Sequence, residues 1–251
     1  MQDEKGLSGM IEVGFKSDKG LKRNNNEDAF FVIPESDIYM VADGVGGNNA
    51  GEIASRTTIS KIVEYIRKNT LKREYTEAEI KDYFLDCIEK VNKSIFNLAM
   101  MQPENVGMAT TVTIAYIRGG KAYITNVGDS RAYIFREGAL TQITEDHTYV
   151  NELIREGAIT KEEALFHEKK NVITKAIGGE ERASPDFFCV DARKGDIIVL
   201  CTDGLHGEIG DENITGILAS GGGMAQACSD LVNKANSCGG HDNITVICLR
   251  I

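Results

Sequence analysis

Four aspartates stand beside apolar runs that predict β-strands, namely Asp43, Asp129, Asp203 and Asp242. The first three come just after such a run, and the fourth comes just before one. In antiparallel sheets the end of one strand lies beside the start of its neighbour, so the four side chains can meet at one edge. Gathered carboxylates repel one another in a partly dry cleft, and hard divalent cations with oxygen ligands relieve that repulsion. The pattern therefore indicates a metal site made of aspartates.

Taken one at a time, the polar residues near these runs have ordinary explanations. An Asp-Gly pair between apolar runs, as at Asp43 and Asp203, is usually only a turn. Asp28 by itself has the surroundings of a solvated loop acid. The histidines lack zinc-ligand spacing, and the six cysteines form no CxxC pair, which favours small buried side chains in a reducing compartment. Only the combination of aspartates points to chemistry.

The apolar runs beside the aspartates predict short strands joined by tight turns. A hairpin across Pro34 to Asp37 joins the first two strands, and further hairpins turn at 119–120 and 137–138. The predicted strands are 29–33, 38–42, 111–117, 122–127, 131–135, 139–143, 186–192, 196–201 and 244–251.

Helical periodicity separates these blocks of strands. Apolar residues from Ile59 to Ile66 recur on one helical face. Thr76 and Glu79 have the spacing of a capping box before a second apolar stripe, which runs to Leu98. Two shorter helices are predicted near 212–219 and 224–237.

Two packed antiparallel sheets with helix pairs outside accommodate these elements. Many strands are apolar on both alternating faces, so each sheet needs cover on both sides. We therefore predict an α+β fold, a four-layer α/β/β/α sandwich, in a single domain over residues 1–251. The polar segment 146–178 interrupts the strands and predicts a flap, with a second capping box at Thr160 and Glu163.

The composition and net charge argue against a nucleic-acid-binding protein and a membrane protein. The 251 residues are 42% hydrophobic, enough for a sizeable core. The formal net charge of −10, from 28 Lys+Arg against 38 Asp+Glu, argues against a protein that grips a nucleic-acid backbone. The chain has no apolar run long enough to span a bilayer and no secretory signal at its start. We therefore expect a cytoplasmic protein that binds neither nucleic acid nor membrane.

Eight short segments together resemble the metal-dependent protein phosphatases of the PPM or type 2C family, in their compact bacterial form. They are RNNNED (23–28), VADGVGG (41–47), GEIAS (51–55), GMATT (107–111), VGDSR (127–131), NVITKAIG (171–178), TDGL (202–205) and DNIT (242–245). The segments follow the family's order and cover the chain from about residue 11 to its end. Each is modest alone, but the ordered set is highly specific.

The resemblance implies a set of ligands for two core metal ions. Asp43, Asp203 and Asp242 would supply side-chain oxygens, with Asp43 bridging both ions. The carbonyl of Gly44 would join one ion, and Glu27 would support a metal-bound water. The family's metals are manganese or magnesium, which suit a site made only of oxygens.

The resemblance also implies roles for residues around that core. Asp129, together with Asp203, would hold a weaker third ion, and Arg23 would bind the phosphate. Val45 stands where some relatives carry a histidine proposed as general acid, so the proton donor is left unassigned. The flap would help to select the substrate.

The implied reaction is hydrolysis of phosphoserine and phosphothreonine monoesters in proteins. The attacking group would be a water or hydroxide that bridges the two metals, without a covalent phosphoenzyme. The expected partners are phosphorylated proteins, including a eukaryotic-like Ser/Thr kinase whose marks the enzyme reverses. We expect a monomer.

Two other functions share parts of this pattern. A two-metal phosphodiesterase or nuclease also uses clustered aspartates, but it needs a basic track that this sequence lacks. A pseudophosphatase would keep the fold as a binding module without catalysis, and the intact ligand positions argue against it. Nucleic-acid cleavage tests the first alternative, and metal titration with a phosphatase assay tests the second.

Overall fold

The computed structural model describes residues 11–47, 50–101 and 103–251. Its strands are β1 (Glu12–Asp18), β2 (Asp28–Ile33), β3 (Ile38–Val45), β4 (Ala109–Thr110), β5 (Val112–Arg118), β6 (Lys121–Val127), β7 (Arg131–Arg136), β8 (Ala139–Gln142), β9 (Asp186–Asp191), β10 (Ile197–Cys201) and β11 (Ile244–Arg250). The first sheet has the order β1-β11-β10-β7-β8. The second has the order β2-β3-β5-β6-β9, with β4 added to β3. The described strand pairs are antiparallel.

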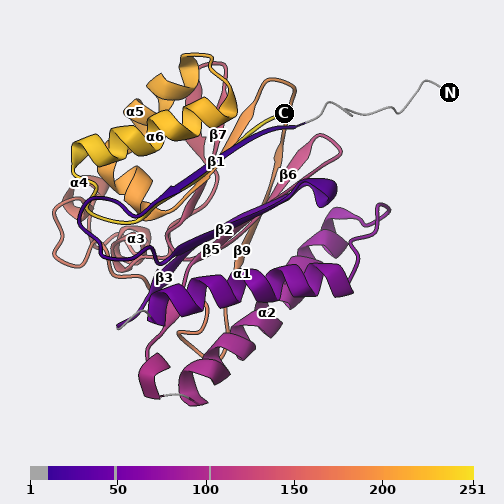
Figure 1. Ribbon diagram of the computed structural model, residues 1–251, viewed down its shortest axis with the longest axis vertical. Coiled ribbons are helices and arrows are strands. Elements are labelled where there is room, and N and C mark those ends of the chain that lie inside the picture. The colour runs from indigo at the N-terminus through magenta and orange to yellow at the C-terminus, as the bar shows by residue number, and fades with distance from the viewer. Residues whose placement is uncertain (1–10, 48–49, 102) are drawn as a thin grey trace.

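Helices cover the outer face of each sheet (Figure 1). Helices α1 (Ala50–Lys68) and α2 (Glu77–Met101) pack on the second sheet, and α5 (Asp203–Ala219) and α6 (Met224–Cys238) pack on the first. The short 3-10 helices are η1 (Pro34–Ser36) and η2 (Pro103–Asn105). The predicted α/β/β/α sandwich is confirmed. Among the described residues, no helix is both long and apolar enough to cross a bilayer.

Strand side chains alternate between the inner core and the outer cores. On β3, Tyr39 and Val41 point into the core between the sheets, whereas Met40 and Ala42 face α1 and α2. Both faces of the central strands are therefore buried. This double burial explains why these strands are apolar throughout rather than at every second position.

The predicted turns and helix caps are confirmed by the backbone. Both residues of 119–120 and both of 137–138 have positive φ, which is the geometry of tight two-residue hairpins. At the start of α2, the Thr76 N–H donates to Glu79 Oε2 at 2.8 Å. The Glu79 N–H donates in return to Thr76 Oγ1 at 3.3 Å, which completes the capping box.

The structure departs most from the sequence-based predictions at β1 and α5. Strand β1 was not predicted, because its residues Glu12–Asp18 are mostly polar and only Gly14 is buried. The helix predicted near 212–219 begins earlier, at Asp203, and bends at Gly210, whose φ of 64° and ψ of 166° are not helical. Several glycines in this helix dilute its apolar stripe, so the periodicity of the first half is weak in the sequence.

The segment between β8 and β9 leaves the sandwich as the predicted flap, with α3 (Tyr149–Arg155) and α4 (Lys161–Ala164). His147 ties its base to the loop before Asp129. The His147 N–H donates to Gly128 O at 3.0 Å, and the Gly128 N–H donates to His147 Nδ1 at 3.0 Å. These paired bonds fix where the flap leaves the sheet.

Candidate active site

The four predicted aspartates lie on four different elements. Asp43 is near the end of β3, inside the strand rather than after it, and Asp129 follows β6. Asp203 is the first residue of α5, and Asp242 comes just before β11. The last three line a cleft of about 1150 Å³ together with residues of the flap.

Asp203 is the centre of this group of carboxylates. Its carboxyl group and that of Asp43 lie close enough for each to act on the pKa of the other. Its charge also acts on Asp28 and Asp129, and the charge of Asp242 acts on it. The structure therefore brings together the acids that are far apart in the sequence.

Burial and mutual repulsion make these carboxyl groups hard to ionise. Burial is the main cause that raises the pKa of Asp129 to about 8, followed by the charge of Asp203. Burial likewise raises the pKa of Asp28 to about 7 and that of Asp43 well above its ordinary value. The pKa of Asp203 is raised by the same cause. A group of acids with raised pKa values in a cleft is typical of a functional site.

Several carboxylate oxygens in this group have no compensating donor. Asp28 Oδ1, Asp129 Oδ1 and Asp203 Oδ1 are buried, and none has a hydrogen-bond partner among the residues that the structure describes. Buried polar atoms are normally satisfied, so each needs an explanation. A divalent cation with oxygen ligands fits this set of donors.

The predicted ligands do not yet converge on a single metal position. Within the described ranges, no three His, Cys, Asp or Glu side chains are arranged as the ligands of one metal ion. Asp242 instead uses both its oxygens within the protein. Oδ2 accepts from Arg23 Nη2 at 2.6 Å, and Oδ1 accepts from the Asn243 N–H at 2.8 Å.

Two threonines hold the backbone of Asp43. The Asp43 N–H donates to Thr111 Oγ1 at 2.9 Å. In return, the Thr111 N–H and the Thr110 hydroxyl donate to Asp43 O, each at 2.8 Å. Thr111 Oγ1 also bonds Ser130 Oγ at 2.7 Å, next to Asp129. The Thr-Thr pair therefore links two of the acidic segments and fixes their spacing.

Both Asp-Gly pairs are required by close backbone packing. A Cβ on Gly44 would lie 2.0 Å from Gly51 O, and a Cβ on Gly204 would lie 2.0 Å from Asn243 O. No larger residue fits at either position without moving backbone. This close approach brings the start of α1 and the loop before β11 against the aspartates.

Arg23 and Glu27 lie beside the carboxylates on the loop before β2. The hydrogen bond to Asp242 is the main cause that raises the pKa of Arg23, and the charges of Glu27 and Asp43 add to it. The Glu27 N–H donates to Asn243 Oδ1 at 2.8 Å. The loop is therefore held against the segment that carries Asp242.

For Asp28, the prediction made from its neighbours in the sequence was wrong. It is only 5% exposed, not a solvated loop acid. The β2–β3 register places Asp28 opposite Asp43, and Thr202 Oγ1 donates to Asp28 Oδ2 at 2.9 Å. Counting the pairs outward from Ile33 and Ile38 across the predicted hairpin would have revealed this position.

Comparison with known proteins agrees with this geometry. The model of the family described as protein phosphatase 2C matches residues 21–240. The chain belongs to the protein phosphatase 2C family. It is 37% identical over 240 residues to the serine/threonine phosphatase stp of Listeria welshimeri, and the match covers 94% of each chain. Family membership makes the chain a metal-dependent protein serine/threonine phosphatase.

Solved structures of similar phosphatases share the whole fold. The serine/threonine phosphatase Stp1 of Staphylococcus aureus matches with a TM-score of 0.90 at 31% identity, over 100% of this chain and 99% of that chain. The catalytic domain of the phosphatase PstP, in complex with two manganese ions, matches with a TM-score of 0.81 at 33% identity. That match covers 96% of this chain and 97% of that chain.

Proposed function

We propose that the cluster of aspartates around Asp203 holds two divalent cations, Mn²⁺ or Mg²⁺. These cations would serve the direct hydrolysis of phosphoserine and phosphothreonine by water. The observation that carries this proposal is the set of buried, unpartnered oxygens on Asp28, Asp129 and Asp203. When bound, such cations lower the pKa of a water molecule and stabilise negative charge on the phosphate.

The core pair would be held by Asp43, Asp203 and Asp242, with Asp43 touching both ions. The mutual effect of the Asp43 and Asp203 carboxyls on their pKa values supports this assignment, because a cation between two buried acids relieves their repulsion. The Gly44 carbonyl would complete the coordination of one ion. Glu27 would accept a hydrogen bond from a water in the coordination shell.

Residues around the core would bind a third ion and the substrate. Asp129 with Asp203 would form the weaker third site, supported by the unpartnered oxygens on both. Arg23 would turn from Asp242 to the phosphate, where its fork can bond two oxygens and neutralise charge in the transition state. This turn needs little energy, because Arg23 is largely exposed.

The relatives support phosphorylated proteins as the substrate class, since their names describe serine/threonine phosphatases. Neither the nuclease nor the pseudophosphatase alternative gains support from them. A Ser/Thr kinase partner, a monomeric state and a cytoplasmic location are further proposals, which rest on the resemblance and on the sequence.

Metal removal tests the proposal most directly. The protein is assayed on phosphoserine, phosphothreonine and phosphotyrosine peptides, first with EDTA and then after Mn²⁺ is restored. Activity on the first two should vanish and return, and Asp43→Asn should lower kcat at least about 10³-fold. The exposed acid Asp82 supplies a matched control, because Asp82→Asn makes the same change on α2 and should be neutral.

Three results would count against the proposal. Activity undiminished by EDTA would remove the role of metals. Cleavage of DNA or RNA with no phosphopeptide hydrolysis would favour the phosphodiesterase. Mn²⁺ binding with no hydrolysis of any substrate would favour a pseudophosphatase.

A further inference from the structure

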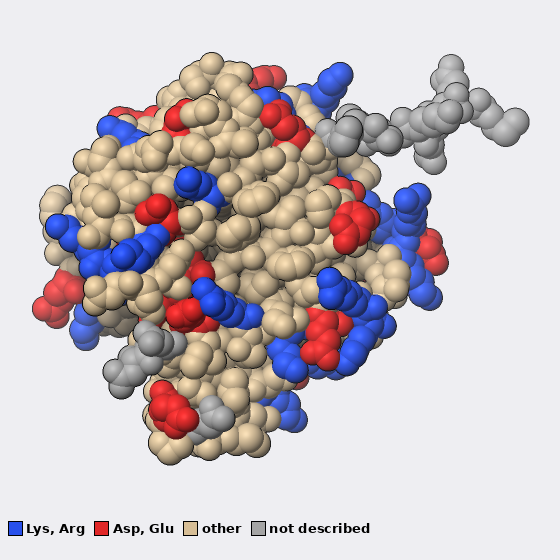
Figure 2. Space-filling model, in the orientation of Figure 1, with Lys and Arg blue, Asp and Glu red and all other residues tan. Residues whose placement is uncertain are grey.

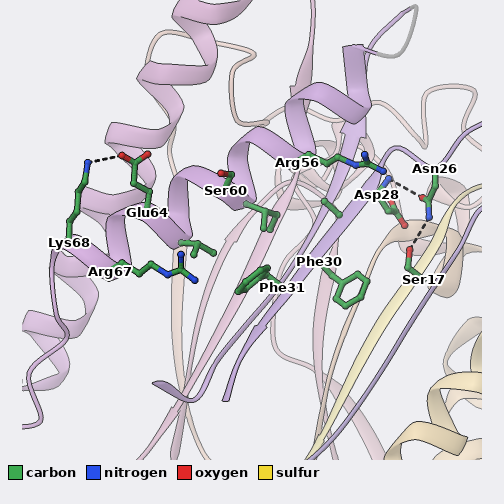
Figure 3. Close-up of a pocket in the computed structure, with 13 residues that line it drawn as sticks. Ser17, Asn26, Asp28, Phe30, Phe31, Arg56, Ser60, Glu64, Arg67 and Lys68 are labelled. Atoms are coloured by element: carbon green, nitrogen blue, oxygen red, sulfur yellow. Dashed lines mark hydrogen bonds and ion pairs between the residues drawn. The ribbon is translucent and has the colours of Figure 1, made fainter. Parts of the chain in front are cut away.

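A second groove, of about 920 Å³, lies between β2 and α1 and shares no lining residue with the catalytic cleft (Figure 3). Its floor is apolar. Phe30 and Phe31 project from β2, and Ile59 and Val63 come from α1. Phe31 is 36% exposed, so part of its ring is open to a ligand in the groove.

Strand β2 forms one edge of the second sheet, and β9 forms the other. Among the described strands β2 pairs only with β3, so one side of its backbone lacks a neighbouring strand. Proteins usually protect such edges with lysine, proline or a bulge. The sequence DAFFVI of β2 contains neither residue, and its pairing with β3 has an unbroken register. The edge is therefore suited to pair with an extended peptide.

The rim of the groove is basic. Its lining has three bases, Arg56, Arg67 and Lys68, and two acids: Glu64 on the rim and Asp28 at the end of the groove near the carboxylates. Figure 2 shows Lys and Arg side chains gathered over the far end of α1. Arg56 is paired with Glu52, and Lys68 with Glu64. Arg67 has no ion pair with any residue that the structure describes. A positive rim on a chain of net charge −10 is complementary to acidic segments.

We propose that this groove docks an extended, acidic segment of the phosphoprotein substrate. The segment adds to β2 as an extra strand, places an apolar side chain against Phe31 and sets a carboxylate beside Arg67. The identity of this occupant rests on the proposed phosphatase function.

The groove is joined to the reaction site through β2. Asp28 lines one end of the groove and lies opposite Asp43 in the β2–β3 register. A protein held in the groove therefore keeps its phosphorylated residues close to the carboxylates. Such tethering raises their effective concentration and lowers KM without a change in the chemical step.

Docking is measured first without catalysis. Fluorescence anisotropy follows the binding of labelled, dephosphorylated casein, an acidic protein, to the full chain in EDTA. Arg67→Glu should weaken binding about fivefold, because it replaces an attraction with a repulsion. The control Lys93→Glu makes the same charge change at an exposed position of α2 outside the groove and should bind like wild type. Equal affinity of all three proteins overturns the proposal.

Steady-state kinetics with Mn²⁺ give the second readout. In Arg67→Glu, KM for phosphorylated casein should rise about fivefold, while kcat and the hydrolysis of p-nitrophenyl phosphate stay unchanged. Phosphorylated myelin basic protein, which is cationic, should show no rise in KM. A rise for both phosphoproteins overturns the proposed charge complementarity.

The two proposals fail in different ways. If wild type hydrolyses no phosphate ester yet binds casein through Arg67, the phosphatase mechanism is wrong and the docking surface stands. If labelled single-stranded RNA binds in an Arg67-dependent way while casein does not, the groove serves nucleic acid and the docking proposal is overturned.

Discussion

The molecule contains two sets of buried acids, which differ in whether hydrogen-bond donors compensate their charge. Asp196, 3% exposed, accepts bonds from Arg136 Nε at 2.9 Å and Nη2 at 2.7 Å, and from the Arg193 N–H at 2.6 Å. Burial acts to raise the pKa of Asp196, but these bonds outweigh it and lower the pKa. Asp129, 6% exposed, leaves Oδ1 without a partner, and its pKa is raised to about 8.

The difference separates acids that support the scaffold from acids that await a ligand. A buried carboxylate without a partner destabilises the fold, so it persists where something outside the chain compensates it. Arg131 and Asp146 repeat the scaffold pattern, with a 2.6 Å bond between Nη2 and Oδ2. Among the described residues, the acids with a buried, unpartnered oxygen are Asp28, Asp129 and Asp203, at the end of the sandwich where the chemistry is proposed.

The largest expected effect is on Asp203. Asp203→Asn should lower kcat on a phosphothreonine peptide at least about 10³-fold, because a core ligand is lost. Metal-free stability in urea should instead rise by about 1 kcal/mol at pH 8, since repulsion between the carboxylates is relieved. A loss of both activity and stability would show that Asp203 supports the scaffold, as Asp196 does, and would contradict its assignment to the uncompensated acids.

The opposite result is expected for Asp196. Asp196→Asn should lower the free energy of unfolding by about 2 kcal/mol, because the charged hydrogen bonds between Asp196 and Arg136 are weakened, while Arg136 keeps its bond to Asp191 O. The kcat for p-nitrophenyl phosphate should be unchanged at a temperature where the variant is folded. Urea unfolding measures the first quantity, and wild-type stability would contradict the assignment.

The two sets of acids should also have opposite effects on how the stability of the fold changes with pH. The raised pKa values of Asp28 and Asp129 mean that the metal-free folded state binds more protons than the unfolded state between about pH 4 and pH 8. Stability should therefore fall as pH rises, by at least about 2 kcal/mol from pH 5 to pH 8. Asp196 has a lowered pKa, so its contribution is present above about pH 4 and is lost as pH falls further.

Saturating Mn²⁺ provides the control for this pH dependence. The cation should remove most of the decline between pH 5 and pH 8, because it takes the place of the bound protons. Urea unfolding at a series of pH values measures both slopes. A metal-free stability that is constant over this range would contradict the assigned burial of uncompensated acids.

The smallest effect concerns an exposed ion pair. Arg23→Ala should raise KM for a phosphothreonine peptide about tenfold through loss of the phosphate contact. It should change the free energy of unfolding by less than about 1 kcal/mol, because the Arg23–Asp242 pair is exposed. Arg250→Ala removes a similar pair with Glu12 far from the cleft and should leave KM unchanged. An unchanged KM in Arg23→Ala would leave the substrate phosphate without an assigned ligand.

Local features of this molecule followed from the sequence alone. The hairpins at 119–120 and 137–138 and the cap at Thr76 each depend on residues that are neighbours in the chain. The order of the motifs, through the family resemblance, also predicts Asp43, Asp203 and Asp242 as metal ligands, and this assignment stays a prediction. The hairpins and the helix cap can be predicted from the sequence because interactions between nearby residues determine them.

Other features were decided only by tertiary contacts. Strand β1 exists because β11 pairs with it, although its own residues are mostly polar. Asp28 is buried because it faces Asp43 across β2 and β3 and receives a bond from Thr202, which is 174 positions away in the chain. Whether a carboxylate is solvated, paired like Asp196 or uncompensated like Asp129 depends on which distant segments close over it. Burial is a property of those segments together, so no local pattern of residues encodes it.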